Sequence, residues 1–183
     1  MAYRNGNYCA FYVDEPFSTW NLGANAAPDF CYYNILRAWK GVDPGFPFND
    51  SHAKNYNVRD GSNWEATLKP RLRERLRNSK NIILFLSSHT RPSKALNEEI
   101  EYGIADQGLP VIVVYPDFDP VLPDGMFDSR SIDLWYDNLP KFFLNMDQVP
   151  TVHVPFEKKA LRKALSCTDY MVSTKSSPGK YRI

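Results

Sequence analysis

The chain has 183 residues, of which 43% are hydrophobic and 14% aromatic, which is enough for one hydrophobic core of ordinary size. Its formal net charge of +1 creates no strong field, so neither nucleic acid nor a membrane is an expected partner. The first residues contain no long apolar run, and the three cysteines have no CxxC spacing, so we expect a soluble cytoplasmic protein without disulfides or metal.

The first half of the chain alternates between short apolar runs and amphipathic segments. Residues 8–13, YCAFYV, predict a strand, and residues 28–41 predict a helix of about three turns. Residues 46–50 predict a weak second strand. Apolar side chains recur every four residues in the segment 64–78 and predict a helix, which Pro70 must kink or divide because proline cannot continue the hydrogen-bond ladder.

The clearest strands are residues 81–88 and 109–115, whose hydrophobicity is continuous rather than alternating. Continuous hydrophobicity is typical of central parallel strands that helices cover on both faces. The segment 92–107 between them predicts a helix. Residues 151–156 predict a fifth strand, and EKKALRKAL, which follows it, predicts a closing helix.

Because strand and helix alternate roughly five times, the sequence predicts an α/β fold with a parallel sheet. We predict a flavodoxin-like three-layer sandwich with a five-stranded parallel sheet in the order 2-1-3-4-5. One domain is expected over residues 1–173, followed by a flexible polar tail over residues 174–183. The switch point of this sheet lies between the first and third strands, so ligand-binding residues are expected in the loops after Val13 and Leu86.

Three glutamates lie close together on the predicted helix 92–107: Glu98, Glu99 and Glu101. The buried face of this helix is lined by small and aliphatic residues, namely Leu96, Ile100, Gly103 and Ile104. Glu98 lies nearly opposite that face and is predicted to be in solvent. Glu99 lies at the edge of the face, where its side chain can lean over the sheet. Geometry alone also allows Glu99 to form an ordinary surface ion pair.

Other polar residues follow the predicted strands. Asp14 ends the first strand, Asp50 and His52 follow the second, and Ser87 and Ser88 end the third. Each could line a pocket, although such residues are also common in turns. Since the third strand ends in serines rather than an aspartate, phosphotransfer of the response-regulator type is not expected.

Alternating cations over residues 69–77 could contact phosphate groups. Alternation spreads them around a helix, however, and no aromatic stacking platform accompanies them, so a solvated face is predicted. The chain also lacks both GxGxxG and GxxxxGK[ST], the two common phosphate-binding loops.

The segment 79–115, SKNIILFLSSHTRPSKALNEEIEYGIADQGLPVIVVY, resembles the core of TIR domains. That core consists of a serine-ended apolar strand, a loop with a further serine, and a helix with a glutamate followed by an aliphatic residue. The residues that start at Ser93 keep the spacing of the TIR pattern S-x-W-C-x-x-E-L, and this resemblance implies that Glu99 is the catalytic glutamate. Ala95 and Leu96 replace the Trp and Cys of the pattern.

Several further segments within residues 8–116 resemble the TIR-like ThsB component of Thoeris antiphage defence systems. These segments are CAFYVDEP, YYNILRAWKG, FNDSHAKN, RDGSNWEATLKPRLRERLRNSKNIILFLSSHT and EEIEYGI. The resemblance implies a substrate-binding crevice lined by residues from the strand ends: Phe11, Tyr12, Asp14 and Ser87. It further implies that Asp50 and His52 contribute to the pocket from the loop after the second strand.

The same resemblance implies cleavage of the nicotinamide–ribose bond of NAD⁺, with NAD⁺ as substrate and no separate cofactor. The product would be an ADP-ribose-derived signal that activates a separate effector protein; a phage-derived trigger and a homo-oligomer are further implied possibilities. Nicotinamide is a cationic leaving group, so one carboxylate that stabilises developing positive charge suffices. Two alternatives stay open: a non-catalytic TIR-like interaction module and an enzyme like the nucleoside 2-deoxyribosyltransferases.

Overall fold

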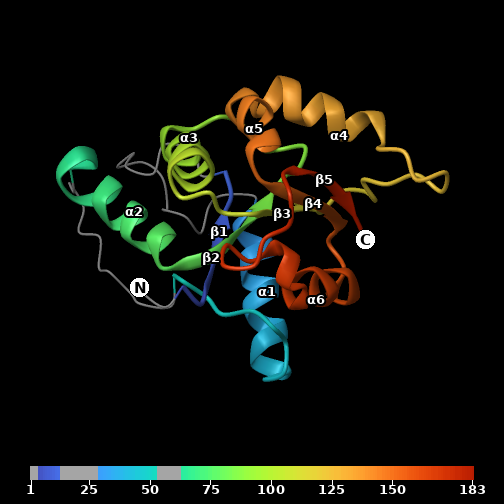
Figure 1. The fold of residues 1–183 in the computed structure, drawn as a ribbon, viewed down its shortest axis with the longest axis horizontal. Coiled ribbons are helices and arrows are strands. Elements are labelled where there is room, and N and C mark those ends of the chain that lie inside the picture. The colour runs from blue at the N-terminus through green and yellow to red at the C-terminus, as the bar shows by residue number, and fades with distance from the viewer. Residues whose placement is uncertain (1–3, 13–28, 53–62) are drawn as a thin grey trace.

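The computed structural model describes residues 4–12, 29–52 and 63–183. Five strands form one parallel sheet in the order β1-β2-β3-β4-β5 (Figure 1). The strands are β1 (Gly6–Ala10), β2 (Ser79–Phe85), β3 (Val111–Tyr115), β4 (Pro150–Pro155) and β5 (Gly179–Arg182). This architecture confirms the predicted flavodoxin-like α/β fold.

Helices cover both faces of the sheet (Figure 1). Those whose residues pack with Tyr8 and Ala10 of β1 are η2 (Trp64–Leu68), α2 (Lys69–Arg77), α3 (Lys94–Ile100), η3 (Glu101–Asp106), η4 (Leu134–Asn138), α5 (Pro140–Asn145) and η5 (Met146–Gln148). Those whose residues pack with Cys9 are α1 (Phe30–Val42), α6 (Lys158–Ser166) and η6 (Thr168–Tyr170). The short helix α4 (Ser129–Asp133) directly precedes η4. Successive residues of β1 therefore belong to two separate cores, as the alternation of side chains in a strand requires.

The predicted second strand, residues 46–50, lies beside β1 but forms only an isolated parallel bridge between Asp50 and Asn7. The Asn7 amide donates to the Asn49 carbonyl at 2.6 Å. Before that point the backbone bonds locally, since the Phe48 amide donates to the Phe46 carbonyl and Pro47 has no N–H to offer. The position of this segment at the sheet edge matches the predicted order, whereas its length as a strand was overestimated.

At the opposite edge, β5 pairs in parallel with β4. The sequence predicted no strand in the polar segment 174–183, and the structure adds one there. The residues of β5 alternate between half-buried and exposed, so this strand shows no continuous apolar run. Here Tyr181 packs against Tyr170, and Arg182 lies over the Phe127 ring at 4.5 Å. The extent of the domain, residues 1–173, stays a prediction.

Three of the described helical segments, η2, η3 and η4, are π-helical turns that adjoin α2, α3 and α4. Pro70 is near the start of α2, and the preceding turn, η2, closes with the Lys69 amide bonded to the Trp64 carbonyl, which confirms the predicted division. Along the segment predicted as helix 92–107, α3 continues into η3. A Cβ atom at Gly103 would lie 2.5 Å from the end of the Ile82 side chain, so any larger residue would have to displace that side chain for η3 to stay this close to β2.

Candidate functional site

Glu99 lies in α3, and its carboxyl group points toward the sheet. The hydroxyl of Tyr8, in the middle of β1, donates a hydrogen bond to Glu99 Oε1 at 2.7 Å. Oε2 is buried and has no hydrogen-bond partner among the residues that the structure describes. The side chain thus lies at the boundary of the buried face, as helical geometry predicts, but its carboxyl group is withdrawn from water.

Burial changes the ionisation of this carboxyl group. It raises the pKa of Glu99 to about 8, although the hydrogen bond from Tyr8 and the positive charge of Arg75 both favour the ionised form. Burial and the neighbouring Glu99 likewise raise the pKa of Tyr8 well above its usual range. At neutral pH the carboxyl group is therefore mostly protonated.

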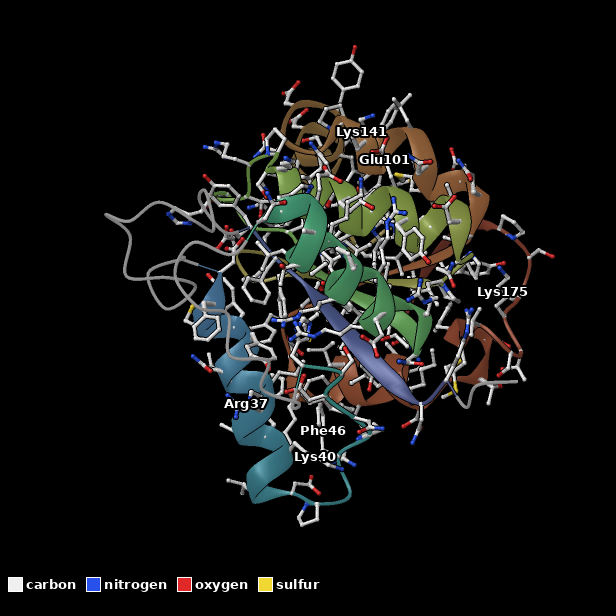
Figure 2. All side chains as sticks on the ribbon, turned by 90° about the vertical axis from the view of Figure 1, so that its left-hand side faces the viewer. Arg37, Lys40, Phe46, Glu101, Lys141 and Lys175 are labelled. Carbon is white, nitrogen blue, oxygen red and sulfur yellow. The ribbon has the colours of Figure 1, made fainter. Side chains whose placement is uncertain are left out.

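The other two glutamates pair with cations of neighbouring helices. Glu98 Oε1 lies 2.6 Å from Arg73 Nε in α2, and the Glu98 side chain is only 15% exposed. The prediction of Glu98 in solvent is therefore wrong, because α2 covers that side of α3. Glu101 is nearly half exposed and pairs with Lys141 of α5 at 2.5 Å (Figure 2).

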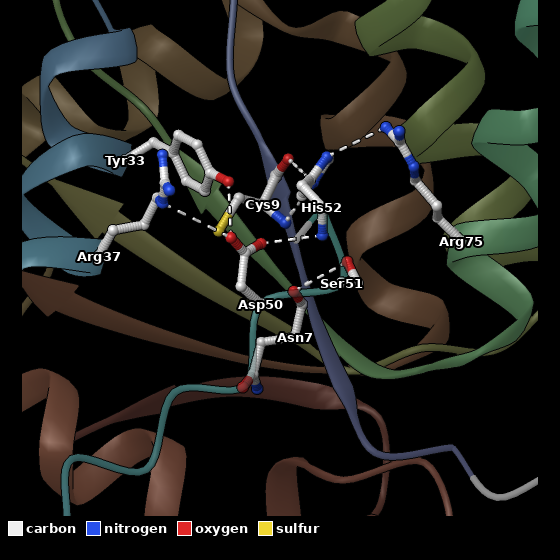
Figure 3. Close-up of polar contacts among 8 residues, drawn as sticks. All are labelled: Asn7, Cys9, Tyr33, Arg37, Asp50, Ser51, His52 and Arg75. Atoms are coloured by element: carbon white, nitrogen blue, oxygen red, sulfur yellow. Dashed lines mark hydrogen bonds and ion pairs between the residues drawn. The ribbon is translucent and has the colours of Figure 1, made fainter. Parts of the chain in front are cut away.

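The imidazole of His52 lies beside the outer edge of β1 (Figure 3). Its Nδ1 is 3.3 Å from an Arg75 nitrogen, and its Nε2 is 3.1 Å from the Cys9 carbonyl oxygen. Because arginine can only donate, Nδ1 accepts from Arg75, while Nε2 lies between the two peptide groups of Cys9, 3.2 Å from its amide nitrogen and 3.1 Å from its carbonyl oxygen. Burial and the charge of Arg75 lower the pKa of His52 to about 4, so the ring is neutral near pH 7. It packs against Tyr8 with ring centroids 4.6 Å apart.

Asp50 joins this cluster from the α1 side (Figure 3). Its Oδ2 accepts from the Tyr33 hydroxyl at 2.7 Å, and its Oδ1 accepts from the His52 amide at 2.8 Å. Arg37 Nε lies 3.9 Å from Oδ2. Asp50 and His52 also line a surface cavity of about 350 Å³. The structure thus brings these two predicted residues together, with their polar atoms engaged by the protein's own groups.

Ser87 is fully buried and belongs to a second polar cluster. Its hydroxyl donates to Asp29 Oδ1 at 2.6 Å, and the Thr90 hydroxyl donates to Asp29 Oδ2 at 3.1 Å. Burial raises the pKa of Asp29 although both hydroxyls favour its ionised form. Asp29 begins α1 without capping it by its own side chain. In the sequence this aspartate is indistinguishable from a routine helix start, so its role as a partner of Ser87 was missed.

Phe11 and Tyr12 follow β1 and pack into different cores. Phe11 stacks on Tyr33 with ring centroids 5.7 Å apart, on the α1 side of the sheet. Tyr12 packs against the core that contains Tyr8. Asp14 lies outside the described residues.

Sequence reasoning also missed Tyr8 and Arg75. Tyr8 was noted only as part of the predicted strand 8–13, and Arg75 was assigned to a solvated face, yet Tyr8 holds Glu99 and Arg75 contacts His52. The described residues contain no group of three or more His, Cys, Asp or Glu placed to hold a metal ion. In the same part of the chain, no helix has the length and apolar character needed to cross a membrane.

The site therefore consists of a desolvated carboxyl group on α3, positioned by β1 and supported by α2 and the segment 49–52. A family model described as Thoeris protein ThsB, TIR-like domain, matches residues 8–120, which is more than half of the chain. The matched region contains Glu99 and every other candidate site residue named from the sequence. The chain belongs to the ThsB family of TIR-like domains.

Proposed function

We propose that this protein is an NAD⁺ nucleosidase or cyclase that serves Thoeris antiphage defence, with Glu99 as its catalytic residue. The observation that carries the proposal is the state of the Glu99 carboxyl group: one oxygen is held by Tyr8, and the other is buried with no partner among the described residues. A buried acceptor of this kind is suited to bind a donor on a ligand, such as a ribose hydroxyl.

The reaction breaks the bond between ribose C1′ and the nicotinamide nitrogen, and nicotinamide leaves with the bonding electron pair. The ribose then carries positive charge, which a nearby carboxylate stabilises strongly because the site is desolvated. In hydrolysis, water adds to C1′ and loses a proton to solvent. In cyclisation, a nucleophilic atom of the substrate itself adds to C1′.

Substrate binding and ionisation of Glu99 are linked in this proposal. The carboxyl group is mostly protonated in the empty protein, since its pKa is about 8. The cationic nicotinamide ring of NAD⁺ favours the carboxylate, so binding lowers the pKa of Glu99 and releases its proton. The charge needed for catalysis then develops only when the substrate is bound.

The ADP-ribose-derived product activates a separate effector protein in the cytoplasm. The protein awaits a phage-derived trigger, works without a cofactor other than its substrate, and acts as a monomer or homo-oligomer. Neither nucleic acid nor membrane takes part.

The test compares Glu99→Gln with Glu98→Gln, a matched control one residue away on the same helix. NAD⁺ consumption is measured with purified protein, and NAD⁺-derived products are measured by mass spectrometry in phage-infected cells. Glu99→Gln should lower turnover about 100-fold or more, whereas Glu98→Gln should retain it. Equal product and equal protection in the Glu99→Gln and wild-type proteins would sink the catalytic assignment.

The same assay separates the two alternatives. A non-catalytic interaction module predicts that Glu99→Gln protects cells as well as the wild type does. A nucleoside 2-deoxyribosyltransferase-like enzyme predicts base exchange on deoxynucleosides with no NAD⁺ turnover.

A further inference from the structure

We infer that Tyr8 is the positioning residue of Glu99: its hydroxyl holds Oε1 and leaves Oε2 as the oxygen that accepts from a hydroxyl of the substrate ribose. This inference rests on the proposed function for its substrate, while the contact itself is a property of the empty protein. It assigns a role in the reaction to a residue that the sequence indicates only as part of a strand.

The contact joins two rigid elements. Tyr8 is 2% exposed and pairs with Ile82 in the register of β1 and β2, so its backbone is fixed by the sheet. Glu99 is near the end of α3, whose start is capped by Ser93. The hydrogen bond of 2.7 Å therefore fixes the torsion of the carboxyl group before any substrate arrives, which lowers the entropy lost on binding.

The Tyr8 ring is itself held in place by His52. The two ring centroids are 4.6 Å apart, and His52 is anchored by the Cys9 carbonyl and by Arg75. Tyr8 therefore cannot rotate away from Glu99 unless this cluster rearranges. The role of His52 in this site is to hold the Tyr8 ring in place by packing against it.

The charged groups around Glu99 come from the elements packed on α3. Tyr8 of β1 and Arg75 of α2 both stabilise the carboxylate. The remaining nearby cations are engaged elsewhere, since Lys69 and Arg73 of α2 pair with Glu98, and Lys141 of α5 pairs with Glu101. Removal of the Tyr8 hydroxyl should therefore leave Arg75 as the main group that favours the ionised form.

The first test is the titration of Glu99 in Tyr8→Phe, followed by ¹³C NMR of glutamate carboxyl groups. The Glu99 signal is identified by its loss in Glu99→Gln. The midpoint should move to higher pH by about one pH unit, because a hydrogen bond to the charged form is lost. The control is Tyr102→Phe on the adjoining η3. This substitution removes a hydroxyl that accepts from Arg77 of α2, and it should leave the Glu99 midpoint unchanged.

A second variant keeps the hydroxyl group and the packing of the ring. Replacement of Tyr8 by 3,5-difluorotyrosine makes the hydroxyl more acidic and a stronger donor, so the Glu99 midpoint should move to lower pH. The two substitutions thus predict shifts of opposite sign, which general disruption of the fold cannot produce. An unchanged midpoint in either folded variant would overturn the inference.

Activity provides an independent measurement. The acidic limb of the kcat/KM profile for NAD⁺ should move to higher pH in Tyr8→Phe, with the rate recovering at high pH. An equal loss at every pH would contradict a positioning role exerted through Glu99. If Glu99→Gln keeps full turnover, the proposed function fails, and the titration still decides whether Tyr8 controls the Glu99 carboxyl group.

Discussion

Two buried polar clusters lie on the same face of this sheet and differ in one respect. In the cluster of Tyr115 and His153, the Trp135 N–H donates to the Tyr115 hydroxyl at 2.5 Å, and that hydroxyl lies 2.8 Å from His153 Nδ1. His153 Nε2 lies 3.3 Å from the Thr151 hydroxyl. Every polar atom in this chain of contacts has a partner. The cluster around Glu99 instead leaves Oε2 without one among the described residues.

The comparison separates a cluster whose polar atoms are paired from one in which a buried carboxyl oxygen is not. Burial raises the pKa of Glu99 to about 8, and burial together with Lys180 and Arg182 lowers the pKa of His153 to about 3. Both groups are therefore neutral near pH 7. The histidine cluster uses its hydrogen-bonding groups to join β3, β4 and η4, whereas Glu99 Oε2 has no partner among the described residues.

The largest expected effect concerns the stability cost of burying Glu99. Its pKa is raised in the folded state, so the folded protein binds the proton more tightly than the unfolded chain does. Relative to Glu99→Gln, the wild-type protein should lose roughly 4 kcal/mol of stability as pH rises from about 4.5 to about 8. Urea unfolding of both proteins across this range measures the difference. Equal pH slopes in the two proteins would show that Glu99 titrates normally.

The contribution of the Tyr115 and His153 cluster to stability is tested by Tyr115→Phe. This substitution removes one hydroxyl and leaves two buried groups, the Trp135 N–H and His153 Nδ1, without that partner. The free energy of unfolding should fall by about 3 kcal/mol, as expected for stranded buried polar groups. Tyr136→Phe is the control, because Tyr136 is 66% exposed and should change stability little. A loss below that of the control would mean that the cluster contributes nothing to stability.

The smallest effect is expected for Glu98→Gln, which keeps the shape of the side chain and removes its charge. Glu98 pairs with Arg73 and Lys69, and these cations are 37% and 26% exposed. Solvent screening limits such pairs to about 0.5–1 kcal/mol, so thermal unfolding should change only slightly. A much larger loss of stability would show that the ion pairs of Glu98 are not limited by solvent screening.

The sequence predicted a residue's position well where that position depends only on the strand or helix to which the residue belongs. Continuous hydrophobicity identified the central strands, and helical geometry separated Glu99 from Glu98 and placed it beside the core. Strands at the sheet edges carry no such signal, so the length of the segment 46–50 was overestimated and β5 was missed.

The partners of the site residues could not be predicted, because they come from distant parts of the chain. Tyr8 and Glu99 are 91 residues apart, and Asp29 and Ser87 are 58 apart. The error at Glu98 has the same origin, since a helical projection identifies the face turned to the sheet but not a second helix that covers another face. Arg75 was likewise read as solvated although it lies against His52.

The arrangement of His52 at the margin of β1 bears on how the protein avoids aggregation. An unpaired strand margin presents peptide groups to which a strand of another molecule can add. Beside β1, residues 49–51 bond to the Asn7 peptide groups, and the His52 imidazole occupies the next position along the strand at Cys9. A side chain thus takes the place of a peptide group and blocks the addition of a foreign strand.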